Sequence, residues 1–477
     1  MSEMPLKEIG SVAPVAIVLL TSLIVILLDA LKRNAALLTC WLAGLGLACA
    51  LVAAYAGIAP GNPPGAFGGM LSTGGFANFF SVVFCASGIL CVLLSKAYIE
   101  RVGIAHGEYY GLILFAVAGM MLMAGAADLM VFFIGLELMS VSFYVLAGFA
   151  RGILPSNEAA LKYFLLGAFA TGFLLYGIAL IYGATASTAL DSVLRHAPSL
   201  AHSPVFLIGL ALLSIGLMFK VAAVPFHMWV PDVYEGAPTT VSAFMSTGGK
   251  AAAFAGFLLV FKPLVFTTDP TLREVLAVVS AISMVAGNVI AIAQTSVKRM
   301  LAYSSIAHAG YILTGVVAAN SAGTNGVLFY LMSYTLMNVG AFGVVSLLER
   351  GDGTMLKFDD CAGLSRRSPL IAALTALFMF SLAGIPPFAG FFGKYYVFTG
   401  AVEAGFTWLA IVGVLMSAVS VYYYLRLVVL MYFSEQEGGS YAPVQMAGLA
   451  ALVIAAIALI GFGVFPSTLL GLTTCCF

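Results

Sequence analysis

Long apolar segments alternate with short polar connections along almost the whole chain. A window of about 19 residues finds about fourteen apolar runs, each close to the roughly 20 residues that an α-helix needs to cross a bilayer. The runs lie near residues 11–31, 36–58, 77–97, 109–127, 128–150, 161–184, 204–229, 239–261, 271–293, 299–319, 324–347, 369–400, 406–433 and 443–466. They are too long and too uniformly apolar for barrel strands, and a helix satisfies its own backbone hydrogen bonds in lipid. The pattern therefore predicts an all-α polytopic membrane protein.

Two of the predicted spans contain proline near the middle. The seventh holds Pro225 shortly after Lys220, and the twelfth holds Pro386 and Pro387 shortly before Lys394. Proline removes a backbone donor and interrupts a helix, and non-helical backbone inside a membrane needs protein or a water-filled cavity beside it. We therefore expect helices 7 and 12 to be broken and to line a pathway.

The two predicted breaks lie five spans apart, which indicates an internal repeat. Spans 4–8 and 9–13 would then form two inverted five-helix repeats, an arrangement that places transport sites at the repeat interface. The expected parts of the chain are residues 1–108 with helices 1–3, 109–262 with the first repeat, 263–435 with the second repeat, and 436–477 with helix 14.

Basic residues are distributed unevenly between the two sides of the predicted membrane. The odd-numbered connections carry thirteen: Lys32, Arg33, Lys96, Arg101, Arg151, Lys162, Lys298, Arg299, Arg350, Lys357, Arg366, Arg367 and Arg426. The other side carries four: Lys7, Arg195, Lys262 and Arg273. Because Lys and Arg favour cytoplasmic connections, we expect the odd connections in the cytoplasm and both termini facing outward.

The composition agrees with a lipid environment and excludes several kinds of site. The chain is 62% hydrophobic and 8% charged, whereas a soluble domain is roughly 45–50% apolar and about 25% charged. Its net charge of zero gives no basic footprint for nucleic acid. The seven cysteines form no CxxC pair or His/Cys cluster with metal-ligand spacing, and no glycine-rich phosphate loop follows a strand. We expect no metal, flavin or nicotinamide site.

Four ionisable side chains lie inside predicted spans: Glu137, Lys220, Lys250 and Lys394. A charge at the bilayer centre costs about 2.5–3.5 kcal/mol on insertion scales, so such residues usually pair with one another or face water. Desolvation favours the neutral form of a lysine, whereas a nearby carboxylate favours the ammonium. We hypothesise that Glu137 and Lys220 form a pair whose opening and closing switches proton release.

Two histidines, His227 and His308, are possible extensions of this route, because imidazole titrates near neutrality. The alternative for each histidine is a hydrogen-bonded packing residue. The alternative for the lysines is a scaffold in which they hold backbone carbonyls. Four ionisable groups on four spans, two of them beside predicted breaks, favour the movement of protons or cations.

Four stretches of the chain resemble the antiporter-like subunits of respiratory complex I. They are Asp128–Ser140, Phe219–Thr240, Arg299–Tyr311 and Gly384–Lys394. The resemblance covers nearly the whole chain, and Leu161–Thr171 is similar to the N-type subunit in particular. It implies that Glu137 is the carboxylate paired with Lys220, that Lys250 is the central relay, and that Lys394 leads to the outlet.

The resemblance also implies a proton-translocating membrane-arm subunit of NADH:quinone oxidoreductase in a bacterial inner membrane, with both termini periplasmic. FMN, iron–sulfur clusters and quinone would then belong to other subunits, with no cofactor in this chain. The expected partners are the K-, M-, L-, J-, A- and H-type subunits and the lipid bilayer. Two related classes share the motifs: subunits of multi-subunit sodium/proton antiporters, and membrane subunits of hydrogenase complexes.

Overall fold

The computed structural model is a bundle of helices, with no β-structure beyond isolated bridges in its described part. The structure describes residues 12–32, 35–58, 65–261, 270–349, 355–435 and 445–474. Some residues used above lie outside the described residues: Lys7, Arg33, Lys262, Arg350, Cys475 and Cys476.

The helices follow one another along the chain with short connections. The longer ones are α2 (Ala13–Leu31), α3 (Ala36–Ala56), α4 (Gly75–Val102), α5 (Gly107–Gly125), α6 (Leu129–Ala147), α7 (Leu154–Thr185), α9 (Pro204–Val221), α14 (Pro270–Ile292), α15 (Val297–Ala318), α16 (Ser321–Leu348), α18 (Pro369–Ala383), α19 (Ala389–Glu403), α20 (Thr407–Phe433) and α21 (Met446–Val464). The shorter ones are α8 (Leu190–His196), η1 (Ala197–Leu200), α10 (Trp229–Gly236), α11 (Thr239–Phe244), η2 (Met245–Gly249), α12 (Lys250–Gly256), η3 (Phe257–Phe261), η4 (Asp359–Cys361), α17 (Leu364–Arg367) and α22 (Pro466–Thr474).

Thirteen helical runs in the described residues are long and apolar enough to cross a membrane, judged by length and composition. One of them, Thr239–Val260, is built from α11, η2, α12 and η3 in succession. A further apolar helix, α18, is shorter, and α19 follows it after a break. The chain is thus an all-α, polytopic membrane protein.

Several helices extend beyond the predicted spans. The helix α7 begins at Leu154 rather than near residue 161, and α4 continues to Val102. Arg101 therefore lies on α4, although the sequence pattern places it in a connection. Three more basic residues that are counted above with the connections also lie on helices: Lys96, Lys162 and Arg426. A hydropathy window ends where polar side chains begin, whereas a helix continues until its backbone hydrogen bonds end.

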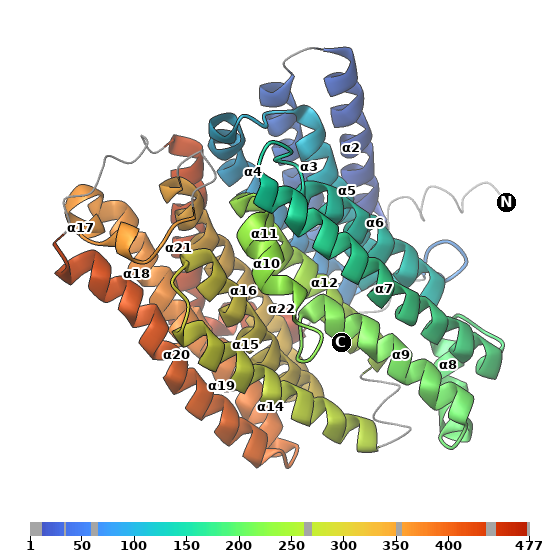
Figure 1. Ribbon diagram of the computed structural model, residues 1–477. Helices are drawn as coiled ribbons and strands as arrows, with labels where there is room; N and C mark the ends of the chain where they lie inside the picture. Colours follow the sequence, from blue (N-terminus) through green and yellow to red (C-terminus); the bar gives the residue numbers. More distant parts are fainter. Residues whose placement is uncertain are drawn as a thin grey trace.

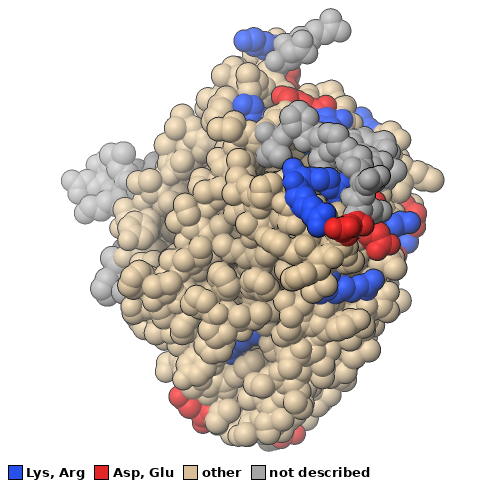
Figure 2. Space-filling model, turned by 90° about the vertical axis from the view of Figure 1, so that its left-hand side faces the viewer, with Lys and Arg blue, Asp and Glu red and all other residues tan. Residues whose placement is uncertain are grey.

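Burial separates a central group of helices from an outer one. The most apolar stretch of α16 is entirely buried, and those of α15 and the Thr239–Val260 run are 94% buried, against 22% for α2. Figure 1 shows α15 and α16 between the outer helices α20 and α7. Figure 2 shows one side of the molecule, where charged side chains gather towards the two ends and a broad, largely uncharged band lies between them. Such a band fits contact with lipid or with apolar partners.

The chain leaves the α-helical conformation at both proline-containing positions. The helix α9 ends at Val221, where the next residue has a φ of 64°, and α10 begins only at Trp229. The helix α18 ends before Gly384, whose φ is 84°, and α19 begins at Ala389. Each break exposes the last carbonyl groups of a helix inside the bundle, where they need a donor.

Candidate functional site

The first buried lysine lies in the last turn of α9. The Lys220 Nζ donates to Ser140 Oγ at 2.7 Å and to Tyr144 OH at 3.5 Å, both on α6. It also lies 5.5 Å from the ring centroid of Tyr144. The C-terminal end of a helix carries partial negative charge, which stabilises a cation there. The end of α9 therefore supports an ammonium group that is only 6% exposed.

The carboxylate predicted to pair with this lysine is close to it but does not touch it. Glu137 lies on α6, less than one turn before Ser140, and is half-buried. It is near enough to interact electrostatically with Lys220. However, no ion pair joins the two within the described residues, and Glu137 Oε1 is buried without a hydrogen-bond partner there. This structure therefore has the hypothesised pair in a separated arrangement.

The second lysine is the hub of a hydrogen-bonded series. Lys250 follows the π-helical segment η2, and its Nζ donates to the Ser305 carbonyl oxygen at 2.6 Å and to Ser305 Oγ. The Tyr334 hydroxyl donates to Ser305 Oγ at 2.9 Å, and Asn338 Nδ2 donates to Tyr334 OH at 3.0 Å and to Ser246 Oγ at 2.7 Å. Every member of the series is buried.

His308 lies one turn after Ser305 on α15, and its ring lies beside the series, 5.0 Å from the ring of Tyr334 between centroids. Its Nδ1 is 2.8 Å from Tyr330 OH and its Nε2 is 3.1 Å from Tyr424 OH. The ring of Tyr311, one turn further along, packs edge-on against the imidazole at 5.6 Å between centroids. His308 is 1% exposed. Both of its nitrogens are therefore engaged inside the protein.

The third lysine lies just beyond the second break. Lys394 Nζ donates to the carbonyl oxygens of Leu382 and Ala383, at 3.1 and 3.0 Å, and to Ser417 Oγ at 2.8 Å. Those two carbonyls belong to the last turn of α18 and have no helical partner because the helix stops there. The Nζ also lies 4.9 Å from the ring centroid of Tyr311. Through Tyr311 the surroundings of Lys394 meet those of His308.

The structure does not join the second predicted histidine to this series. His227 lies between α9 and α10 and is half-buried. Its Nδ1 has no hydrogen-bond partner among the described residues. The polar side chains that lie between Lys250 and Lys394 are on α15 instead.

The sequence alone does not indicate a role for the neutral groups near the lysines. Ser305, Tyr334 and Asn338 surround Lys250, and Tyr311 contacts Lys394, yet Ser and Tyr are ordinary residues in apolar helices. The sequence does contain one usable signal, the 305, 308 and 311 spacing, which places three polar side chains on one helical face.

Comparison with known proteins agrees with this architecture. Residues 126–420 match the family model described as NADH:quinone oxidoreductase/Mrp antiporter, TM. NADH-quinone oxidoreductase subunit N 1 of Chloroherpeton thalassium is 48% identical over 95% of this chain and 94% of its own length.

Two solved structures are also similar. A chain of respiratory complex I from Thermus thermophilus is 36% identical, with a TM-score of 0.82 over 96% of this chain and 98% of that one. A chain of the Mrp complex from a Dietzia species, at 22% identity, shares the fold with a TM-score of 0.86 over 99% of this chain and 97% of its own. The chain belongs to the NADH:quinone oxidoreductase/Mrp antiporter transmembrane family and, within it, to the NADH-quinone oxidoreductase subunit N proteins.

Proposed function

We propose that this chain conducts protons across the membrane through Lys220, Lys250 and Lys394, as a membrane-arm subunit of NADH:quinone oxidoreductase. One observation carries the proposal: Lys250 and Lys394 are buried, and each contacts a polar side chain on the same face of α15. Hydroxyl and imidazole groups accept a proton on one side and release another on the opposite side, so such a series can transfer protons without moving its members far.

Each ionisable residue has a distinct role in this mechanism. Glu137 and Lys220 form the switch, because closing the pair favours the ammonium and opening it favours release of the proton. Lys250 receives the proton at the centre and passes it by way of Ser305 towards His308. Lys394 takes it from there, held by the free carbonyls at the end of α18.

The wider assembly follows from the same proposal. The chain would lie in a bacterial inner membrane with both termini periplasmic, and residues 109–262 and 263–435 would be two inverted repeats. It would contact K-, M-, L-, J-, A- and H-type subunits through apolar faces like that in Figure 2. FMN, iron–sulfur clusters and quinone would reside in those other parts of the complex and supply the redox energy.

The test is proton pumping by vesicles that contain the purified complex with Lys250→Met, with NADH:quinone turnover measured in the same preparation. Methionine keeps an unbranched side chain of similar length but cannot carry a proton. We expect the complex to assemble and both activities to be lost. Lys96→Met, on α4 with its Nζ over the Trp41 ring and away from the series, is the matched control and should keep both activities. Wild-type pumping by Lys250→Met would exclude the relay.

A further inference from the structure

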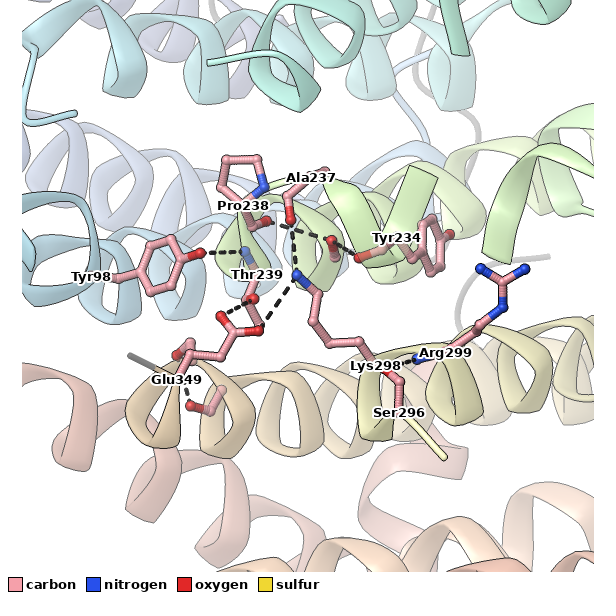
Figure 3. A network of polar contacts seen from close by, with 12 residues as sticks. Tyr98, Tyr234, Ala237, Pro238, Thr239, Ser296, Lys298, Arg299 and Glu349 are labelled. Atoms are coloured by element: carbon pink, nitrogen blue, oxygen red, sulfur yellow. Dashed lines mark hydrogen bonds and ion pairs between the residues drawn. The ribbon is translucent and has the colours of Figure 1, made fainter. Parts of the chain in front are cut away.

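A second buried cluster of charges lies where α4, α11, α15 and α16 meet. Lys298 Nζ is 3.5 Å from Glu349 Oε1 and donates to the Ala237 carbonyl oxygen at 2.9 Å. The Thr239 hydroxyl donates to Glu349 Oε2, and the Thr239 N–H donates to Tyr98 OH at 3.0 Å. Figure 3 shows these side chains converging on the start of α11. We had predicted Lys298 in a connection, but it lies in the first turn of α15.

This ion pair is costly to bury, which calls for a reason. The side chains of Lys298 and Glu349 are 6% and 9% exposed. Removing two charges from water often costs more than their attraction returns, and apolar residues of similar volume frequently pack as well. A purely structural clamp at this position would not need charge.

Two adjoining cavities lie beside the pair, one lined by it and one further out. The inner cavity, of about 40 Å³, is lined by Tyr98, Lys298 and Glu349, and that volume accommodates water. The outer one, of about 200 Å³, is lined by charged residues that include Asp232 and Arg299. The two cavities share lining residues: Pro155, Glu235, Gly236 and Met355. These shared residues form a wall between the outer cavity and the inner cavity that Lys298 and Glu349 line.

The shared wall is held in place by ion pairs at the mouth. Arg299 lies 2.8 Å from Glu235 and 3.1 Å from Asp232, and Lys162 lies 2.8 Å from Asp232. Desolvation acts to raise the pKa of Asp232, but the two cations outweigh it and hold that pKa below its ordinary value. The mouth is therefore polar and charged at neutral pH, so water can reach the wall.

A line of buried hydroxyls leads inward from the pair to the central lysine. Thr239, Ser242, Ser246 and Lys250 follow at intervals of three or four residues, so they lie on roughly one face of the helical run. The run covers about 16 Å at 1.5 Å per residue. Ser246 already belongs to the series that reaches Lys250 through Asn338.

We propose that the Lys298–Glu349 pair is the gate through which protons enter the relay from the outer cavity. This inference rests on the proposed function. Glu349 accepts a proton from water in the inner cavity, and the neutral carboxyl group releases its hold on Lys298. The carboxyl O–H then donates to Thr239 Oγ1, and the Thr239 hydrogen turns towards the hydroxyl line, so one proton enters for each one passed on. The titratable groups facing the inner cavity are Tyr98, Glu235, Lys298 and Glu349.

The decisive variant replaces both charges, Lys298→Met with Glu349→Leu, in the assembled complex. Because no unpaired charge remains, a structural clamp would survive this change. We expect full assembly with loss of proton pumping in vesicles and a matching fall in NADH:quinone turnover. The control removes an exposed ion pair, Arg366→Met with Glu435→Leu, and should pump as the wild type does. Wild-type pumping by the Lys298/Glu349 variant overturns the gate.

A second pair of variants decides the matter if the double variant does not assemble. Thr239→Val keeps the shape of the side chain but removes the hydroxyl, and Thr239→Ser keeps the hydroxyl. We expect pumping to be lost in the first and restored in the second, and equal pumping in both overturns the gate. If Lys250→Met stops pumping while these variants do not, the entry proposal fails and the relay stands.

Discussion

Lys394 shows how one cation is held inside the bundle by neutral groups. Within the described residues its acceptors are two backbone carbonyls and one hydroxyl, and no carboxylate pairs with it. Carbonyl dipoles at a helix end offset part of the desolvation cost of the ammonium. Neutral acceptors also hold the cation less firmly than a carboxylate would, which suits a group that must release its proton.

At the same scale, His308 should be more sensitive to substitution than His227. His308→Phe leaves the buried Tyr330 hydroxyl without its partner, and an unsatisfied buried polar group costs about 1–3 kcal/mol. It also removes the titratable side chain that lies between Ser305 and Tyr311 on α15. We expect reduced thermal stability and loss of proton pumping in vesicles.

His227→Phe is the comparison, because the Nδ1 of that imidazole has no hydrogen-bond partner among the described residues. It should assemble and keep most of its pumping. Equal losses of stability and of pumping in the two variants would contradict the prediction that the two hydrogen bonds of His308 make it the more sensitive residue.

Among the elements, α5 and α6 cross unusually closely at two glycines. A Cβ on Gly135 would lie 2.8 Å from the Gly119 carbonyl oxygen and 2.8 Å from the Met123 nitrogen. Small residues allow helices in lipid to approach this closely. The crossing positions α6, which carries Glu137 and Ser140, against the rest of the first predicted repeat. In the second predicted repeat, α14 and α15 also cross closely, because a Cβ on Gly287 would lie 2.5 Å from the Ala307 backbone nitrogen.

Gly135→Ala should therefore weaken the bundle by about 1–3 kcal/mol, the usual cost of overpacking, because backbone atoms must move to make room. The measurement is the temperature at which this subunit dissociates from the purified complex on native gels. Gly172→Ala is the matched control, because nothing lies within 4 Å of its added Cβ. If both variants dissociate at the same temperature, the close crossing is not required.

The sequence predicted the elements better than their partners. A charge in an apolar run is conspicuous, so Lys220, Lys250 and Lys394 were identified directly. The proline positions also indicated where helices 7 and 12 leave the α-helical conformation. Hydroxyl groups in apolar helices usually bond the carbonyl one turn back, as Ser140 does with Leu136. Nothing in the sequence distinguishes the hydroxyl groups that also accept a hydrogen bond from a lysine.

Across the whole molecule, hydropathy separates the centre from the outside only by degree: the most buried runs, α15, α16 and Thr239–Val260, are less apolar than the outer helix α2, yet all are apolar enough to cross a membrane. The outer helix α2 and the central helix α16 are both apolar, because lipid and protein interior are similar solvents for a side chain. The buried Lys298–Glu349 pair was missed for a related reason. Lys298 stands just before a predicted span, so the pattern assigns it to a connection, and nothing in the sequence distinguishes Glu349, yet the fold covers both side chains.

The orientation of the molecule in the membrane gives the last prediction. Arg366 and Arg367 lie in α17, shortly after η4. By contrast, Arg195 is the single Lys or Arg between α7 and α9. Figure 1 places α17, next to η4, and α8 at opposite ends of the molecule. The excess of basic residues near α17 predicts that this end faces the cytoplasm.

The orientation can be measured with single cysteines at two exposed positions, Ser199→Cys after α8 and Asp359→Cys in η4. Both are introduced into a variant in which the seven native cysteines have been replaced. A maleimide that cannot cross membranes should label Ser199→Cys in right-side-out spheroplasts and Asp359→Cys in inverted vesicles. The opposite pattern would turn the molecule over and place the cavity beside Lys298 and Glu349 on the periplasmic side. The gate would then be an exit, since protons pumped out of the cell leave from that side.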